Sequence, residues 1–105
     1  MNPSARQIGA RAARRPETLR GLTWAWADEI GIRPKRVEVR QLTRKWASCS
    51  TSGRLILSRR LLREGRGVQD YVIVHELLHL RVPNHGKLFK RLMDVHLGQN
   101  KRGGA

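Results

Sequence analysis

The chain has 105 residues, a formal net charge of +14 at pH 7 and a single cysteine, Cys49. This length supports one domain with a modest core and excludes the two lobes that flank a deep cleft. One cysteine excludes an internal disulfide, and no apolar run approaches the roughly 20 residues of a membrane span. We therefore expect a protein of the reducing cytoplasm with no membrane contact.

Residues 1–15 predict a disordered basic arm. Their charge is only positive, from Arg6, Arg11, Arg14 and Arg15, and no apolar run in them suits a secretory signal. More Lys and Arg residues are dispersed along the chain, without a nucleic-acid-binding motif. We expect non-specific, salt-sensitive contact with nucleic acid, with specific recognition as the alternative.

Residues 16–30 predict an amphipathic helix. Apolar side chains recur there at the helical period, namely Leu19, Leu22, Trp26 and Ile30. Pro16 suits the first turn of a helix, and Gly31 suits the position just after its end. The helix should lie on the core by its apolar face, with Trp24 off that face.

The middle of the chain predicts strands. Val37 and Val39 alternate with polar residues, as in a half-buried strand. Residues 46–50 form a second extended segment, and Thr51-Ser52-Gly53 has the composition of a tight turn into residues 54–58. An antiparallel hairpin is therefore expected.

The second half of the chain predicts helices. A short helix or turn over residues 61–64 is followed by Gly65 and Gly67, which should break it. A helix then begins at about residue 68 or 69 and continues to Leu80, and a last helix spans 87–97. The prediction is an α+β domain over residues 16–98, with a small antiparallel sheet packed on helices, and a flexible tail over 99–105.

The central helix carries polar side chains within the most apolar stretch of the chain, in the run His75-Glu76-Leu77-Leu78-His79. Burying imidazoles and a carboxylate there requires hydrogen bonds, a paired charge or a metal ion. His75 and His79 are four residues apart, so they lie about 6 Å apart on one helix face and can bind one ion. Glu76 is rotated by roughly 100° from His75, which places its carboxylate beside the ion.

His85 is the predicted third ligand. A catalytic zinc normally has three protein ligands and a water. Pro83 should end the helix near Arg81, and Asn84 suits a turn. A chain that reverses direction there returns His85 to the same ion.

Other residues stay open as alternatives. No Glu follows Glu76, which excludes a later glutamate ligand. Asp94 and His96 remain possible ligands of the last helix, and Asp94 suits better the role of holding a ligand imidazole. Cys49 is expected to be a small buried residue, with a thiolate that blocks the zinc as the alternative.

This set predicts a hydrolytic mechanism. Zinc lowers the pKa of a bound water to about 7, so the neighbouring Glu76 can act as general base. Tyr71, one helical turn before His75, either donates to the developing oxyanion or packs the helix, and packing is the simpler expectation.

Three segments together resemble one known family: Trp46-Ala47-Ser48-Cys49-Ser50, the helix from Tyr71 to Leu80, and Pro83-Asn84-His85. They look like the YgjP-like family of small zinc metallopeptidase-type hydrolases, which is similar to the SprT-like minimal zincins. The resemblance implies a zincin-like α+β core, zinc bound by His75, His79 and His85, and Glu76 as general base. The family's Trp-Gly-Ser-Cys reads Trp-Ala-Ser-Cys here.

The leading hypothesis is a zinc-dependent peptidase that pairs an extended peptide or protein substrate with one strand of the hairpin. One alternative, implied by a branch of the family, is a pyrophosphatase acting on a nucleoside triphosphate such as UTP. The other is a polyanion-binding module in which zinc only supports the fold.

Overall fold

The computed structural model describes the backbone of residues 18–104 and the side chains of residues 18–98. The predicted basic arm over 1–15 lies outside these described residues. The fold is α+β, as predicted. Its elements in chain order are α2 (Leu19–Ile30), β1 (Arg36–Arg40), β2 (Ala47–Cys49), β3 (Arg54–Ser58), the 3-10 helix η1 (Arg59–Arg63), α3 (Arg66–His79) and α4 (Lys87–Gly104).

The three strands form one sheet with the order β1-β3-β2. The predicted hairpin is confirmed, because β2 and β3 pair antiparallel with Ser48 opposite Ile56. The sheet is mixed rather than wholly antiparallel, since β1 pairs with β3 in parallel, with Val37 opposite Leu55. The amide of Lys35 donates to the carbonyl of Gly53 at 2.8 Å, which aligns the starts of β1 and β3. The apolar strand β3 thus takes the centre of the sheet, and β1 and β2 form its edges.

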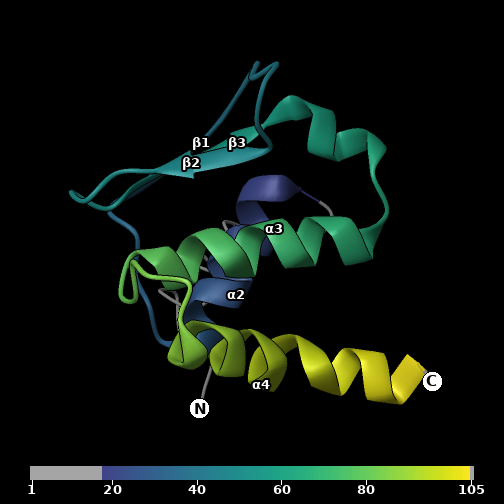
Figure 1. The fold of residues 1–105 in the computed structure, drawn as a ribbon. Helices are drawn as coiled ribbons and strands as arrows, with labels where there is room; N and C mark the ends of the chain where they lie inside the picture. Colours follow the sequence, from purple (N-terminus) through teal and green to yellow (C-terminus); the bar gives the residue numbers. More distant parts are fainter. Residues whose placement is uncertain (1–17, 105) are drawn as a thin grey trace, which may run out of the picture.

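The elements stack in layers with α3 in the middle. Figure 1 shows the sheet on one side of α3 and α4 on the other, with α2 packed alongside. Two clusters of buried side chains fill the spaces. One joins the sheet to α2 and α3 and includes Leu55, Leu57 and Ile73, and the other joins α3 to α4 and includes Leu78 and Phe89. The central helix is therefore buried on most of its circumference, as its apolar sequence predicts.

Helix α2 differs from its prediction at the start only. It begins at Leu19 instead of Pro16, because the Thr18 hydroxyl accepts a hydrogen bond from the Gly21 amide and caps the first turn. It ends at Ile30 as predicted, and Gly31 caps it with a φ of 83°. Trp24, expected off the apolar face, packs partly buried against the core.

Helices α3 and α4 are longer than predicted. Helix α3 begins at Arg66, because Gly65 takes the extended cap position and Gly67 lies in the first turn, where it does not break the helix. Helix α4 continues to Gly104 instead of ending at Leu97, since Gly98 weakens a helix by only about 1 kcal/mol and no proline follows it. In the part of the chain that the structure describes, no helix combines the length and apolarity that a membrane span requires.

Candidate metal centre

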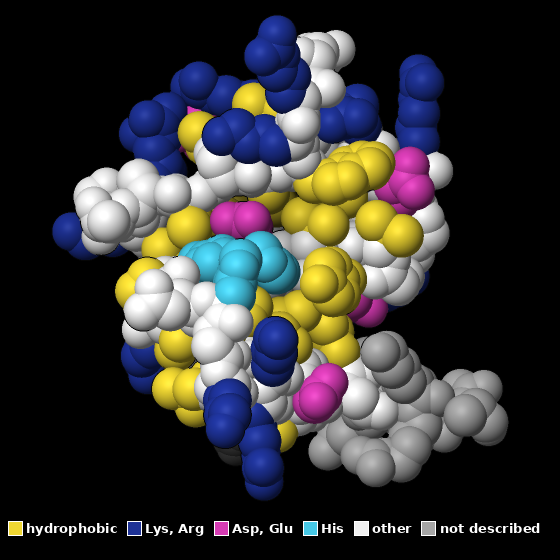
Figure 2. Space-filling view, in the orientation of Figure 1, with side chains coloured by type: hydrophobic (Ala, Val, Ile, Leu, Met, Phe, Trp, Pro, Cys, Tyr) yellow, Lys and Arg dark blue, Asp and Glu magenta, His cyan; other side chains and the backbone are white. Residues whose placement is uncertain are grey.

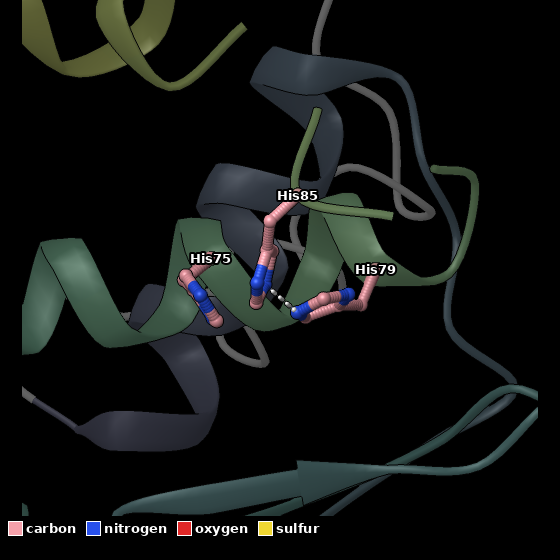
Figure 3. Close-up of side chains that lie close together, drawn as sticks. All are labelled: His75, His79 and His85. Atoms are coloured by element: carbon pink, nitrogen blue, oxygen red, sulfur yellow. Dashed lines mark hydrogen bonds between the residues drawn. The ribbon is translucent and has the colours of Figure 1, made fainter. Parts of the chain in front are cut away.

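Three histidine side chains meet on one side of α3. His75 and His79 belong to α3, and His85 lies in the segment between α3 and α4. One ring nitrogen from each lies within 4.8 Å of the others, and the Nε2 atoms of His79 and His85 are 2.7 Å apart (Figure 3). The three imidazoles therefore direct one ring nitrogen each toward a common position.

The end of α3 brings the third imidazole to the other two. The amide of Arg81 donates to the carbonyl of Leu78, three residues back, at 3.0 Å, which tightens the last turn before Pro83. The chain then reverses, and α4 begins just after Gly86, whose carbonyl accepts from the Lys90 amide at 3.1 Å. This local geometry positions the segment that holds His85.

The carboxylate of Glu76 lies beside the imidazoles. One oxygen is 3.4 Å from Nδ1 of His75, and the side chain is half-buried. Glu76 and His79 also line a depression of about 490 Å³ between α3 and β2. Figure 2 shows histidine side chains together at the surface with an acidic side chain next to them. A carboxylate thus faces open space next to the three ring nitrogens.

Phe89 supports all three imidazoles, a role that the sequence does not reveal. Its ring centroid lies 5.2 Å from that of His75, 4.8 Å from that of His79 and 4.7 Å from that of His85. The side chain is only 3% exposed, so the ring forms a fixed wall beneath the histidines. The sequence places Phe89 four residues after His85, but His85 precedes α4, so helical spacing does not indicate this contact.

The pKa of His79 is lowered, chiefly by burial and next by its neighbour His75. Both causes disfavour the charged imidazolium. The neutral ring, which the lowered pKa favours, is the form that binds a metal ion.

The alternative ligands do not join the three histidines. His96 lies in a separate depression with Trp26 and Asp70, so it is not a ligand of this centre. Asp94 lines a depression with His75 and His85, but among the residues described no hydrogen bond links it to an imidazole. The role of Asp94 as a holder of a ligand ring is therefore not supported.

Tyr71 and Cys49 also differ from simple core residues. Tyr71 is 54% exposed and its ring stacks on His75 at a centroid distance of 5.9 Å, so it packs along the surface of α3 and not in the core. Cys49 is partly buried beside Glu76. Burial first, and then the nearby carboxylate, raise the pKa of its thiol to about 11. Cys49 is therefore a neutral thiol near neutral pH and not part of the histidine group.

The layered fold and the grouped histidines with an adjacent carboxylate define a metallopeptidase-type domain. A solved structure supports this class: it is described as the metallopeptidase zymogen of Pyrococcus abyssi abylysin, and it superposes with a TM-score of 0.64 at 25% identity. The match covers 73% of this chain and 77% of that one.

The chain belongs to the YgjP-like family. The model of the YgjP-like metallopeptidase domain matches residues 5–103. A search of curated proteins gives no match. The family indicates a hydrolase that uses a metal ion, and His75, His79 and His85 are the residues that could hold it.

Proposed function

We propose that this protein is a zinc-dependent peptidase in which His75, His79 and His85 bind the ion and Glu76 is the general base. The observation that carries the proposal is the approach of three ring nitrogens to within 4.8 Å of one another next to a carboxylate. Imidazole nitrogens suit zinc, and three protein ligands are the number typical of a catalytic zinc.

The chemistry divides between the ion and the chain. Bound zinc supplies a Lewis acid that polarises the scissile carbonyl and lowers the pKa of water. Glu76 accepts the proton of the attacking water and returns it to the leaving amine. Phe89 fixes the orientation of the three imidazoles, and the stacked ring of Tyr71 limits the rotation of His75.

The substrate is proposed to bind along β2. This strand is an edge of the sheet, and Ala47, Ser48 and Cys49 line the same depression as Glu76 and His79. An extended peptide can add to such an edge through main-chain hydrogen bonds, which places its carbonyl groups next to the ion. Side-chain selectivity would then come from the rest of the depression, which includes Lys45, Thr51 and Pro83.

The test separates metal binding from turnover. Glu76→Gln should keep zinc, measured by elemental analysis, and lower the cleavage of labelled casein by at least about a hundredfold. His79→Ala should lose both zinc and activity. Glu64→Gln, which removes a carboxylate away from the site, is the control and should change neither.

Two outcomes would overturn the proposal. A Glu76→Gln variant that cleaves casein at the normal rate would remove the general base from the mechanism. Chelator-sensitive hydrolysis of UTP by a chain that leaves casein and a peptide library intact would replace the peptidase with a pyrophosphatase.

A further inference from the structure

A second groove lies at the opposite edge of the sheet, away from the histidines. It has a volume of about 500 Å³ and runs between α2 and the edge strand β1. Its lining combines four cations, one carboxylate, one aromatic ring and two valines: Arg20, Lys35, Arg36, Arg40, Glu38, Trp24, Val37 and Val39. The groove therefore has an excess of three positive charges and a tryptophan within it.

One carboxylate holds two arginines of this groove and a third, Arg54, that lies beside it. Glu38, whose side chain is 14% exposed, pairs with Arg36 at 2.9 Å, with Arg40 at 2.8 Å and with Arg54 at 3.1 Å. Arg54, which also donates a hydrogen bond to Glu38, is the largest cause of the lowered pKa of this carboxyl, so it stays ionised near neutral pH. A single negative charge cannot neutralise three guanidiniums.

The guanidiniums keep free donors toward solvent. The side chains of Arg36 and Arg40 are 72% and 56% exposed, although each is held by Glu38. A guanidinium has five N–H donors in a planar fork, so one that pairs with a carboxylate can still bind a phosphate. The pairing with Glu38 fixes their positions and so reduces the entropy lost when a ligand binds.

The row of cations in the groove fits a chain of phosphates better than a single one. Arg36 and Arg40 are four residues apart in β1, but their Nε atoms converge on the carboxylate of Glu38, so the two arginines can hold one phosphate together. Lys35 and Arg20 extend the row of positive charge at the two sides of the groove. A polyanion with successive phosphates can contact several of them at once.

Trp24 adds an aromatic ring to the groove, which binding of a phosphate chain alone would not require. Its ring packs partly buried on the core and lines the groove beside Arg20, so it is a fixed aromatic surface among cations. Aromatic rings next to a positively charged groove are typical of proteins that bind single-stranded nucleic acid, because unpaired bases stack on the rings. Bases within a duplex are already stacked and paired, which leaves no face for the ring.

We propose that the groove between α2 and β1 binds a single-stranded nucleic acid, with a phosphate on Arg36 and Arg40 and an unpaired base on Trp24. This binding is separate from the proposed peptidase function. It uses the edge of the sheet opposite β2, and none of the residues that line this groove lines the depressions around the three histidines.

The first experiment tests the cations with a matched control. Binding of the full chain to a short fluorescein-labelled single-stranded DNA is followed by anisotropy over a series of salt concentrations. Arg36→Glu with Arg40→Glu should weaken binding by about tenfold or more and reduce the slope of log K against log salt. Arg59→Glu with Arg63→Glu lowers the net charge equally on η1 and should have a clearly smaller effect. Equal losses in the two double variants would overturn the proposal.

The second experiment tests the base and the ring. Trp24→Leu should weaken binding by about fivefold or more, whereas Trp46→Leu, at an exposed tryptophan outside the groove, should not. An abasic strand of the same length should bind the unaltered protein more weakly than the normal strand, which tests stacking even if Trp24→Leu does not fold. Equal binding of the abasic strand, or tighter binding of a duplex or of inorganic polyphosphate, would overturn the proposal.

Discussion

Replacing Phe89 by leucine tests whether the ring beneath the histidines prepares them for metal. The ring lies within 5.2 Å of all three imidazole centroids, and Leu keeps an apolar side chain there without aromatic faces. An aromatic contact is worth about 0.5 to 1.5 kcal/mol beyond the area it buries, and these three contacts share one ring, so they do not add. With the loss of volume, the free energy of unfolding of the metal-free protein should fall by about 1 to 2 kcal/mol.

The same change should weaken metal binding. Residues that orient ligands affect metal affinity by about tenfold to a hundredfold, and we expect the lower end because His75 and His79 are also held by α3. Zinc affinity is measured by competition with a chromophoric chelator, and stability by urea titration of the metal-free protein. Met93→Leu, in the same buried cluster of α4, is the control. If the two variants lose stability and zinc affinity equally, Phe89 is a core residue without a role in the site.

Three further predictions follow from local geometry. In the metal-free protein Cys49 should react slowly with iodoacetamide near pH 8 and faster as the pH approaches 11, where its thiol ionises. Glu76→Gln should speed the reaction, because removing the carboxylate lowers the pKa of that thiol. A reaction rate at pH 8 like that of free cysteine would contradict this prediction. Asp70→Ala should lower the free energy of unfolding, measured by denaturant titration, by about 1 to 3 kcal/mol, because the indole N–H of Trp26 loses its acceptor at 2.8 Å. The same substitution should lower it by less in a Trp26→Phe background, where that N–H is absent. Gly53→Ala should lower the free energy of unfolding by about 1 kcal/mol or more, because φ at Gly53 is 97° and the added Cβ would lie 3.3 Å from the backbone nitrogen of Lys35. An unchanged melting temperature would refute this strain.

The features of the site that could be predicted from the sequence depend on neighbours in the chain. The spacing of His75 and His79 fixes their common face, and the proline after α3 fixes the turn that returns His85. The tight turn between β2 and β3 is likewise encoded by adjacent residues, with Gly53 at a positive φ. Such features need no knowledge of the tertiary packing.

The features that could not be predicted depend on contacts between distant segments. His96 is seven residues after Phe89 and shares its helix face, but it lies about 10 Å further along the axis, where it reaches the depression of Trp26 and Asp70. Helical periodicity alone does not show which part of a face meets the metal centre. The parallel pairing of β1 with β3 also depends on how residues 41–46 cross the sheet, which strand patterns do not specify.

The two edges of the sheet are chemically unlike, and this difference supports the division of roles between them. An edge strand exposes unpaired N–H and C=O groups, and charged side chains discourage the addition of another strand. Edge strand β1 has charged residues at alternate positions, Arg36, Glu38 and Arg40, whereas β2 has the small uncharged residues Ala47, Ser48 and Cys49. This difference favours the proposed binding of a peptide at β2, next to Glu76 and the histidines. The charges that would keep a peptide from β1 also favour the proposed contact of that strand with phosphates.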